Sequence, residues 1–166
     1  YPETYDKNMP EDLIYTGSKK FTDTVDGVEL NAGKLVLSPT RTYAPIINKI
    51  FSEIGRDCID GIIHCSGGAQ TKVLNFIENL HIIKDSLFDI PPLFEMIQKE
   101  SQTQWREMYQ VYNMGHRMEI YVDEKFANHI ISISKSFDID AKVIGKVEKC
   151  DTKKLTILTE QGEFTY

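Results

Sequence analysis

Apolar residues recur at helical spacing in five stretches of the chain, and each stretch predicts a helix with one buried face. The clearest is expected to run from about Thr42 to Gly55, where the glycine ends it, because four apolar residues follow the i, i+3, i+4 and i+7 pattern: Ile47, Ile50, Phe51 and Ile54. The other predicted helices carry Val73, Leu74 and Ile77 after an N-cap at Ser66; Leu93, Phe94 and Ile97 after Pro91-Pro92; Trp105 to Tyr109; and Phe126, Ala127, Ile130, Ile133 and Phe137 after a cap at Asp123.

Short apolar runs between these helices predict strands. Residues 113–122 turn extended, with Met118, Ile120 and Val122 alternating against Arg117, Glu119 and Tyr121, which indicates one buried face. Residues 141–148 and 155–159 are expected to pair as a closing hairpin. The remaining expected strands are Lys34 to Leu37, Ile59 to His64, a short one near His81 to Ile83, and an irregular one from Lys19 to Val25.

Strands interleaved with helices predict an α+β (α/β layered) fold, in which a mixed β-sheet is covered by helices. Residues 1–33 are polar and broken by proline and glycine, so they are interpreted as a linker segment in front of a domain formed by residues 34–166. Pro10-Glu11-Asp12 is expected to open a short helical turn within the linker.

Composition narrows the function classes. The 166 residues are 41% hydrophobic and 27% charged, which fits one globular domain, and the net charge of −6 argues against nucleic acid as a partner. The longest apolar runs fall short of the roughly 20 residues that a membrane span needs, so a soluble protein is expected. Three cysteines without a CxxC pair and four histidines without an HxxH pair predict no disulfide framework, no protein-built metal site and a cytoplasmic location. The first residue, Tyr1, suggests a piece of a longer protein.

The segment His64-Cys65-Ser66-Gly67-Gly68-Ala69 is the strongest candidate for chemistry. It joins a buried strand to a helix, where glycines allow close approach and free amide groups attract an anion such as phosphate. A tight turn with Ser66 as the cap explains the same residues without a ligand. Cys65 beside the glycines has two interpretations as well, a nucleophilic thiol or a small buried side chain.

Two further segments carry candidate ligand-binding groups, each with a plain structural alternative. Thr40 offers a hydroxyl and Arg41 a guanidinium suited to carboxylate or phosphate, or else they start a helix at the surface. Asn113 can bind an amide or a sugar hydroxyl, Gly115 permits close approach, and Arg117 adds positive charge. A turn with positive φ at Asn113 or Gly115 is the alternative.

Several segments occur in the order and spacing of one family across residues 34–148. Lys34 to Tyr43 resembles Leu-x-Pro-Thr-Arg-x-Tyr, and Gly61 to Gly68 resembles Ala-His-x-Thr-Gly-Gly-Gly. The others are Ile90 to Gln98, similar to Pro-x-x-Phe-x-x-Ile-Gln; Glu107 to Gly115, similar to Glu-Met-x-x-x-Phe-Asn-x-Gly; and Val143 to Val147, similar to Ile-Gly-x-Ile/Val. Together they resemble the C-terminal domain of aminoimidazole ribonucleotide synthetase, also called phosphoribosylformylglycinamidine cyclo-ligase.

The resemblance implies a two-domain enzyme of purine biosynthesis, a homodimer at full length, whose N-terminal half binds ATP and Mg²⁺. The implied reaction activates the formamide oxygen of formylglycinamidine ribonucleotide as a phosphate ester and closes the imidazole ring with loss of phosphate. It further implies that Ser66, Gly67, Gly68 and Gly115 lie in the substrate- or phosphate-binding site, that Thr40 and Arg41 hold the substrate, and that His64 and Asn113 are catalytic residues that orient polar groups.

Departures from the family pattern mark a divergent branch. Ala69 stands for the third glycine, Ser66 for threonine, and His116 and Arg117 for small or apolar residues. The alternatives are another ATP-using member of the superfamily, such as selenophosphate synthetase, thiamine monophosphate kinase or the hydrogenase maturation factor, and a binding domain without catalysis.

Overall fold

The chain divides into two compact units, each described here by itself. The structure is a computed structural model that describes residues 18–38 and 41–166, so the turn expected at Pro10 lies outside the described residues. One unit comprises residues 1–40 and 90–104, and the other comprises residues 41–89 and 105–166. None of the helices within the described ranges combines the length and apolar character that a membrane crossing needs.

The described part of the first unit contains α1 (Ala32–Val36) and α3 (Pro92–Ser101). The strand predicted at Lys34 to Leu37 is wrong, because these residues belong to α1 and its C-cap. The Asn31 side chain accepts a hydrogen bond from the Lys34 amide at 2.9 Å, which caps the helix and outweighs the β-type composition of a short run. The irregular strand predicted near Lys19 is wrong too: the segment consists of turns with one isolated bridge, Thr24 to Asn31.

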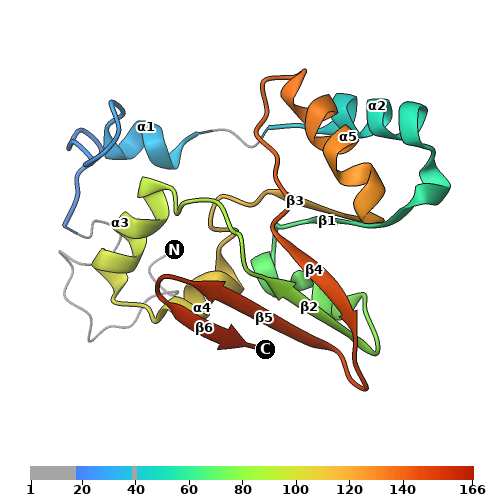
Figure 1. Cartoon of the computed structure of the whole chain (residues 1–166). Helices are drawn as coiled ribbons and strands as arrows, with labels where there is room; N and C mark the ends of the chain where they lie inside the picture. The colour runs from blue at the N-terminus through green and yellow to red at the C-terminus, as the bar shows by residue number, and fades with distance from the viewer. Residues whose placement is uncertain (1–17, 39–40) are drawn as a thin grey trace, which may run out of the picture. The chain divides into compact units, whose positions relative to one another are not determined.

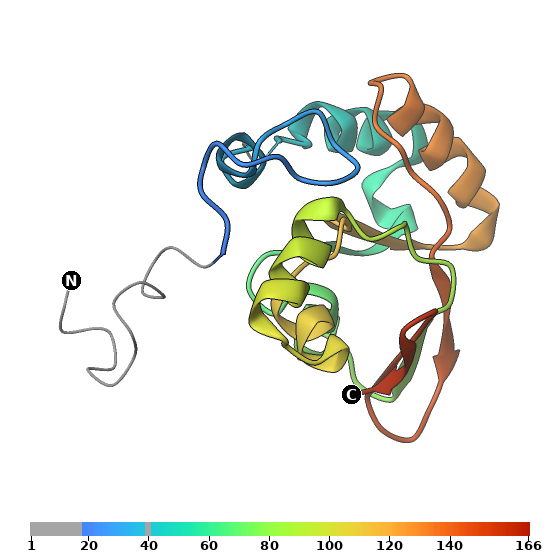
Figure 2. The same ribbon diagram turned by 90° about the vertical axis from the view of Figure 1, so that its left-hand side faces the viewer.

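Two helices and a two-stranded sheet form one core of the second unit. The helices are α2 (Ala44–Ile54) and α5 (Glu124–Lys135), which lie side by side (Figure 1, Figure 2). The sheet pairs β1 (Ile59–His64) antiparallel with β3 (Met118–Val122). Ile46, Ile50, Ile130 and Ile133 are buried between the helices, and Ile59, Ile120 and Val122 of the strands pack on them. Helices α2 and α5 confirm most of the predicted apolar stripes, but Phe137 lies beyond α5 and is 39% exposed. On β3 the most buried residue is Glu119, from the face predicted to be polar, so the prediction of a single buried face is wrong there.

A four-stranded mixed sheet forms the rest of this unit. Its order is β4-β2-β5-β6, with β2 (Leu80–Lys84) parallel to β5 (Lys154–Thr159) and antiparallel to β4 (Gly145–Lys149), while β6 (Gly162–Thr165) pairs with β5. The mixed sheet and the α+β layout are therefore confirmed. Helix α4 (Trp105–Val111) contacts the 3-10 helix η4 (Ala69–Asn75), and a further 3-10 turn, η3, covers Arg56–Cys58.

The predicted closing hairpin is wrong in its pairing. Strand β4 pairs with β2, and β5 pairs with β6 instead. Gly145 shows how closely β4 approaches β2, because a Cβ atom there would clash with the Ile83 carbonyl oxygen. Sequential strands often pair, but here β2 inserts between β4 and β5 and leaves the hairpin to β5 and β6.

Candidate functional site

The turn after β1 is built by residues with left-handed backbone geometry. Gly68 has φ of +83° and Ala69 has φ of +41°, which reverses the chain between β1 and η4. The prediction that Ser66 caps a helix is wrong, because Gly68 occupies the N-cap position and the segment that follows is a 3-10 helix. The Ser66 carbonyl instead accepts a hydrogen bond from the Ala69 amide at 2.8 Å. The turn is exposed at Ser66, Gly67 and Gly68.

A lysine lies over this turn. The Lys72 ammonium donates to Ser66 Oγ at 2.8 Å and to the His64 carbonyl oxygen at 3.1 Å. The amides of Gly67 and Gly68 donate to no acceptor within residues 18–38 and 41–166. A Cβ atom added at Gly67 would meet nothing within 4 Å, so space is open in front of the turn. Two free amides, a hydroxyl and a cation together suit an anion.

A second loop precedes β3 and holds itself in shape. Asn113 Oδ1 accepts a hydrogen bond from the Gly115 amide at 2.9 Å, and the Asn113 carbonyl accepts one from the His116 amide at 2.9 Å. Met114 and Gly115 have φ of +50° and +92°. The turn interpretation of this segment is confirmed at Gly115, with Asn113 serving as the residue whose side chain closes the turn.

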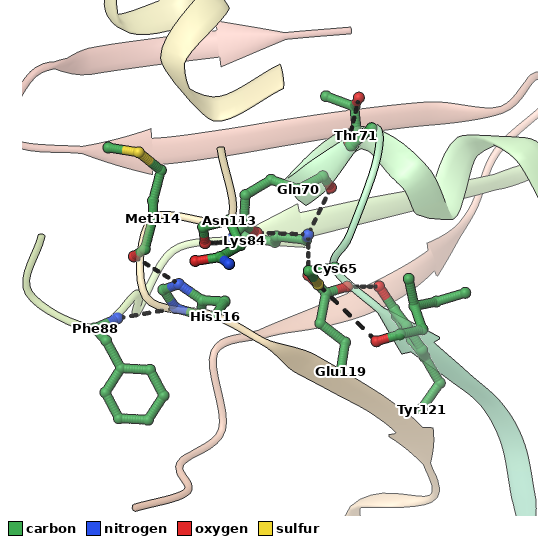
Figure 3. A network of polar contacts seen from close by, with 12 residues as sticks. Cys65, Gln70, Thr71, Lys84, Phe88, Asn113, Met114, His116, Glu119 and Tyr121 are labelled. Atoms are coloured by element: carbon green, nitrogen blue, oxygen red, sulfur yellow. Dashed lines mark hydrogen bonds and ion pairs between the residues drawn. The ribbon is translucent and has the colours of Figure 1, made fainter. Parts of the chain in front are cut away.

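A buried polar network underlies both loops (Figure 3). Gln70, which is fully buried, donates from Nε2 to the Asn113 carbonyl oxygen at 2.8 Å. The Lys84 ammonium donates to the carbonyl and side-chain oxygens of Gln70, both at 2.8 Å, and to Glu119 Oε1 at 2.5 Å. Lys84 and Glu119 are 1% and 5% exposed. An ion pair thus lies in the protein interior, next to a glutamine that bridges the two loops.

The network also suppresses ionisation of two neighbouring groups. Cys65 Sγ donates to Glu119 Oε1 at 3.4 Å and Tyr121 Oη donates to Glu119 Oε2 at 2.6 Å. Burial, reinforced by the Glu119 carboxylate, raises the pKa of the Cys65 thiol to about 12. The same two causes raise the pKa of Tyr121 well above its usual range. Cys65 is therefore a buried thiol, and the nucleophile interpretation is not supported.

His116 is buried beside the network in its neutral form. Its Nε2 accepts a hydrogen bond from the Phe88 amide at 3.0 Å, so the proton resides on Nδ1, which faces the Met114 carbonyl oxygen at 3.2 Å. Burial lowers the pKa of His116 to about 4. His116 therefore links the loop before β3 to the chain after β2 without carrying charge.

Curated proteins of one name match most of the chain. A phosphoribosylformylglycinamidine cyclo-ligase from Syntrophus aciditrophicus is 32% identical over 147 residues, which cover 81% of this chain and 39% of that protein. Those from Methanococcus maripaludis and Methanocaldococcus jannaschii are both 31% identical, covering 80% and 72% of this chain and 40% and 35% of their own lengths. The chain is homologous to the phosphoribosylformylglycinamidine cyclo-ligases. No family model matches it.

The chain spans about 40% of the length of the cyclo-ligases it matches, and the matched portion is their C-terminal part. The resemblance found in the motifs is thereby confirmed. Two of the cyclo-ligase segments, Gly61 to Gly68 and Glu107 to Gly115, are brought together in the structure, because β1 pairs with β3 and the Cys65 amide donates to the Arg117 carbonyl oxygen at 2.9 Å.

The cyclo-ligase segment Lys34 to Tyr43 falls across the boundary between the two units. Thr40 lies outside the described residues, and Arg41 is exposed in front of α2. His64 is exposed at the end of β1, and its side chain has no hydrogen-bond partner in the described part of the chain. The sequence therefore located both turns along the chain, and their role in binding stays a prediction.

Four residues of the site were missed by sequence reasoning: Lys72, Gln70, Lys84 and Glu119. Lys72 had a usable signal, because it is a cation only four residues after the Gly67-Gly68 turn. Glu119 was assigned to the polar face of a half-buried strand, but it is buried, since β3 is covered on both faces. Within the ranges 18–38 and 41–166, no group of three or more His, Cys, Asp or Glu side chains is arranged to hold a metal ion.

Proposed function

We propose that this chain is the C-terminal half of an ATP-dependent cyclo-ligase of purine biosynthesis, which converts formylglycinamidine ribonucleotide into aminoimidazole ribonucleotide and releases ADP and phosphate. The observation that carries the proposal is 32% identity over 81% of the chain to a protein of that name. Since the relatives described all carry the cyclo-ligase name, this function is favoured over the sister enzymes of the superfamily and over a binding domain without catalysis.

In this reaction ATP supplies the phosphoryl group that turns the formamide oxygen into a leaving group. An amidine nitrogen then attacks the formamide carbon that carries this oxygen, and phosphate departs as the ring closes. The protein contributes mainly by holding the reacting groups in register and by stabilising negative charge. We assign ATP and Mg²⁺ to the N-terminal half of the enzyme, as the resemblance to the cyclo-ligases implies.

The turn after β1 is the proposed phosphate-binding element of this half. The free amides of Gly67 and Gly68, the Ser66 hydroxyl and the Lys72 ammonium supply donors on one exposed surface. Lys72 is an addition that the geometry makes to the residues expected from the sequence. A phosphate group there would accept hydrogen bonds from the two free amides and from the Ser66 hydroxyl and Lys72 ammonium, which now bond within the turn.

The remaining assignments extend from this turn. We propose that His64 and Asn113 orient polar groups of the substrate, that Gly115 allows its close approach, and that Thr40 and Arg41 hold it from another side. Residues 34–166 would form the C-terminal domain and residues 1–33 the linker to the N-terminal domain. A homodimer at full length and a cytoplasmic location complete the proposal, the latter supported by three free thiols at Cys58, Cys65 and Cys150.

The deciding experiment is an assay of aminoimidazole ribonucleotide formation from formylglycinamidine ribonucleotide and ATP, using the longest polypeptide that the gene encodes. Product formation that depends on ATP is the expected result. A folded polypeptide that hydrolyses or binds ATP but makes no product would overturn the cyclo-ligase proposal and favour a sister enzyme.

Gly67 provides the sharpest test of the phosphate turn. Gly67→Asp puts a carboxylate beside the proposed anion, and it should raise the KM for the phosphorylated substrate about tenfold or more. The position tolerates a side chain, because it has open space and no positive φ, unlike Gly68. Gly67→Asn is the matched control: it has the same size without the charge and should keep most of the activity. Equal KM values for the two variants would contradict a phosphate at this turn.

A further inference from the structure

Gln70 connects the two loops of the candidate site, the turn after β1 and the loop before β3. It is the second residue of η4, directly after the Gly67-Gly68 turn, and its side chain reaches across to the Asn113 carbonyl oxygen at 2.8 Å. That carbonyl also accepts the His116 amide, which closes the loop before β3. A change in the position of Gln70 would therefore move both loops together.

Lys84 fixes Gln70 in this position. All three donors of its ammonium group are used: two on the carbonyl and side-chain oxygens of Gln70, and one on Glu119 Oε1 (Figure 3). Strand β2 supplies Lys84 and strand β3 supplies Glu119, so the contact joins the two sheets of this unit to η4. No polar side-chain atom buried within the described residues lacks a partner.

Stability alone is a poor reason for such an arrangement. Burying two charges costs free energy that their attraction only partly offsets, and well-packed apolar residues at the same positions are often neutral or more stabilising. What apolar side chains cannot supply is direction, since each hydrogen bond of Lys84 and Gln70 fixes one acceptor in space. Two of the three donors of Lys84 bind Gln70, the residue that connects the loops.

We propose that Gln70 is a positioning residue of the enzyme, which holds the Ser66–Gly68 turn and the Asn113–His116 loop in register, and that Lys84 with Glu119 fixes the orientation of its side chain. This inference rests on the proposed function for its effect on catalysis. Its structural part, the coupling of the two loops, stands on the contacts of Gln70 and is testable without substrate.

The test is a pair of variants with a matched control. Gln70→Glu keeps the oxygen that faces Lys84 and removes the donor to Asn113, whereas Gln70→Met removes both. Tyr121→Phe removes the hydrogen bond on the other oxygen of Glu119, at 2.6 Å, and leaves Gln70 and Lys84 untouched. All three are compared with the parent by hydrogen exchange of single amides, by thermal unfolding and by steady-state kinetics of the full-length polypeptide.

We expect both Gln70 variants to speed exchange at the Gly115 and His116 amides by about five- to tenfold relative to the β5 amides, the loss of roughly one hydrogen bond. Their kcat/KM should fall by a similar factor. Tyr121→Phe should change stability but neither the relative exchange nor kcat/KM. Unchanged exchange at Gly115 and His116, or a uniform rise that follows global stability, would overturn the inference. If the parent makes no product, the proposed function fails, while the exchange data still decide the coupling.

Discussion

Two lysine–glutamate pairs lie on the four-stranded sheet and its neighbour, and they differ in burial rather than in distance. Lys84 and Glu119 are 2.5 Å apart with side chains 1% and 3% exposed, whereas Lys146 and Glu148 on β4 are 2.6 Å apart with side chains 60% and 47% exposed. Lys146 even lies opposite Ile83, the neighbour of Lys84. Two contacts of nearly the same length therefore lie in very different surroundings.

The difference shows that burial determines how strongly each charge depends on its partner. At the surface, the hydrogen bond to Glu148 raises the pKa of Lys146, and the same bond lowers the pKa of Glu148, but water stabilises either residue alone. In the interior, each charge depends on its partner, because water is excluded from both. The buried pair thus constrains the fold around it, while the exposed pair lies on an edge strand and constrains little.

Removing one charge of the buried pair should have the largest effect. Glu119→Leu leaves the Lys84 ammonium buried without a counter-charge, and we expect the free energy of unfolding to fall by about 3–5 kcal/mol. Urea denaturation measures the change. The double variant Lys84→Met/Glu119→Leu should recover much of the loss, since no charge remains. A double variant as unstable as Glu119→Leu would show that the positions, and not the unpaired charge, determine the cost.

The sequence predicted which apolar residues of the second unit are buried in most of its helices and strands. It did not predict the buried pair of Lys84 and Glu119. The stripes on α2 and α5 and the strands β1, β2 and β3 were found because periodic apolar residues report burial directly. The burial of Lys84 and Glu119 was not predicted, because a charged residue is normally exposed. Their burial depends on a pairing between strands that are distant in the sequence. The hairpin error has the same origin, since strand order is not encoded by local periodicity.

The backbone conformation was predicted correctly where glycine alone determines it. It was missed where a hydrogen bond or a cap from another residue determines it. The positive φ at Gly115 and the helix end at Gly55 follow from glycine itself. The residues at Lys34 to Leu37 became helical through a cap at Asn31, and the Ser66 cap failed because Gly68 took that position. Motif spacing found the two turns of the site, but only the folded chain reveals Lys72 and Gln70 beside them.

His116 extends the comparison to a buried group that stays neutral. Burial lowers its pKa to about 4 from an ordinary value of 6.5. Between these values the unfolded chain binds a proton that the folded chain does not, so the free energy of unfolding should decrease as the pH falls from about 6.5 to 4, by about 3 kcal/mol from this group. Stability curves measured at several pH values test this.

His116→Gln is the control for that pH dependence. Its side-chain carbonyl can accept the Phe88 amide hydrogen bond in place of Nε2 and cannot titrate in this range. The variant is expected to lose some stability at pH 7 and to show a flatter profile between pH 6.5 and 4. A variant whose profile parallels that of the parent would assign the acid sensitivity to other groups.

The reactivity of Cys65 is a second probe of the buried lysine–glutamate pair. Its raised pKa predicts that iodoacetamide at pH 8 modifies Cys58 and Cys150, which are half-buried, well before Cys65. Peptide mass spectrometry after short exposures measures the order. Glu119→Gln removes the nearby negative charge and should make Cys65 react faster, provided that the variant remains folded. Equal rates for Cys65 in parent and variant would indicate that access, rather than the carboxylate, protects the thiol.

The exposed pair should give the smallest effect of all. Lys146→Met leaves Glu148 in contact with water, so we expect no measurable change in the urea midpoint, and raising the salt concentration should not distinguish the variant from the parent. The comparison with Glu119→Leu is direct, because both changes remove one member of a short lysine–glutamate contact. If Lys146→Met destabilised the protein as strongly as Glu119→Leu, distance rather than burial would determine the strength of these pairs, and the contrast between the two sides of the sheet would fail.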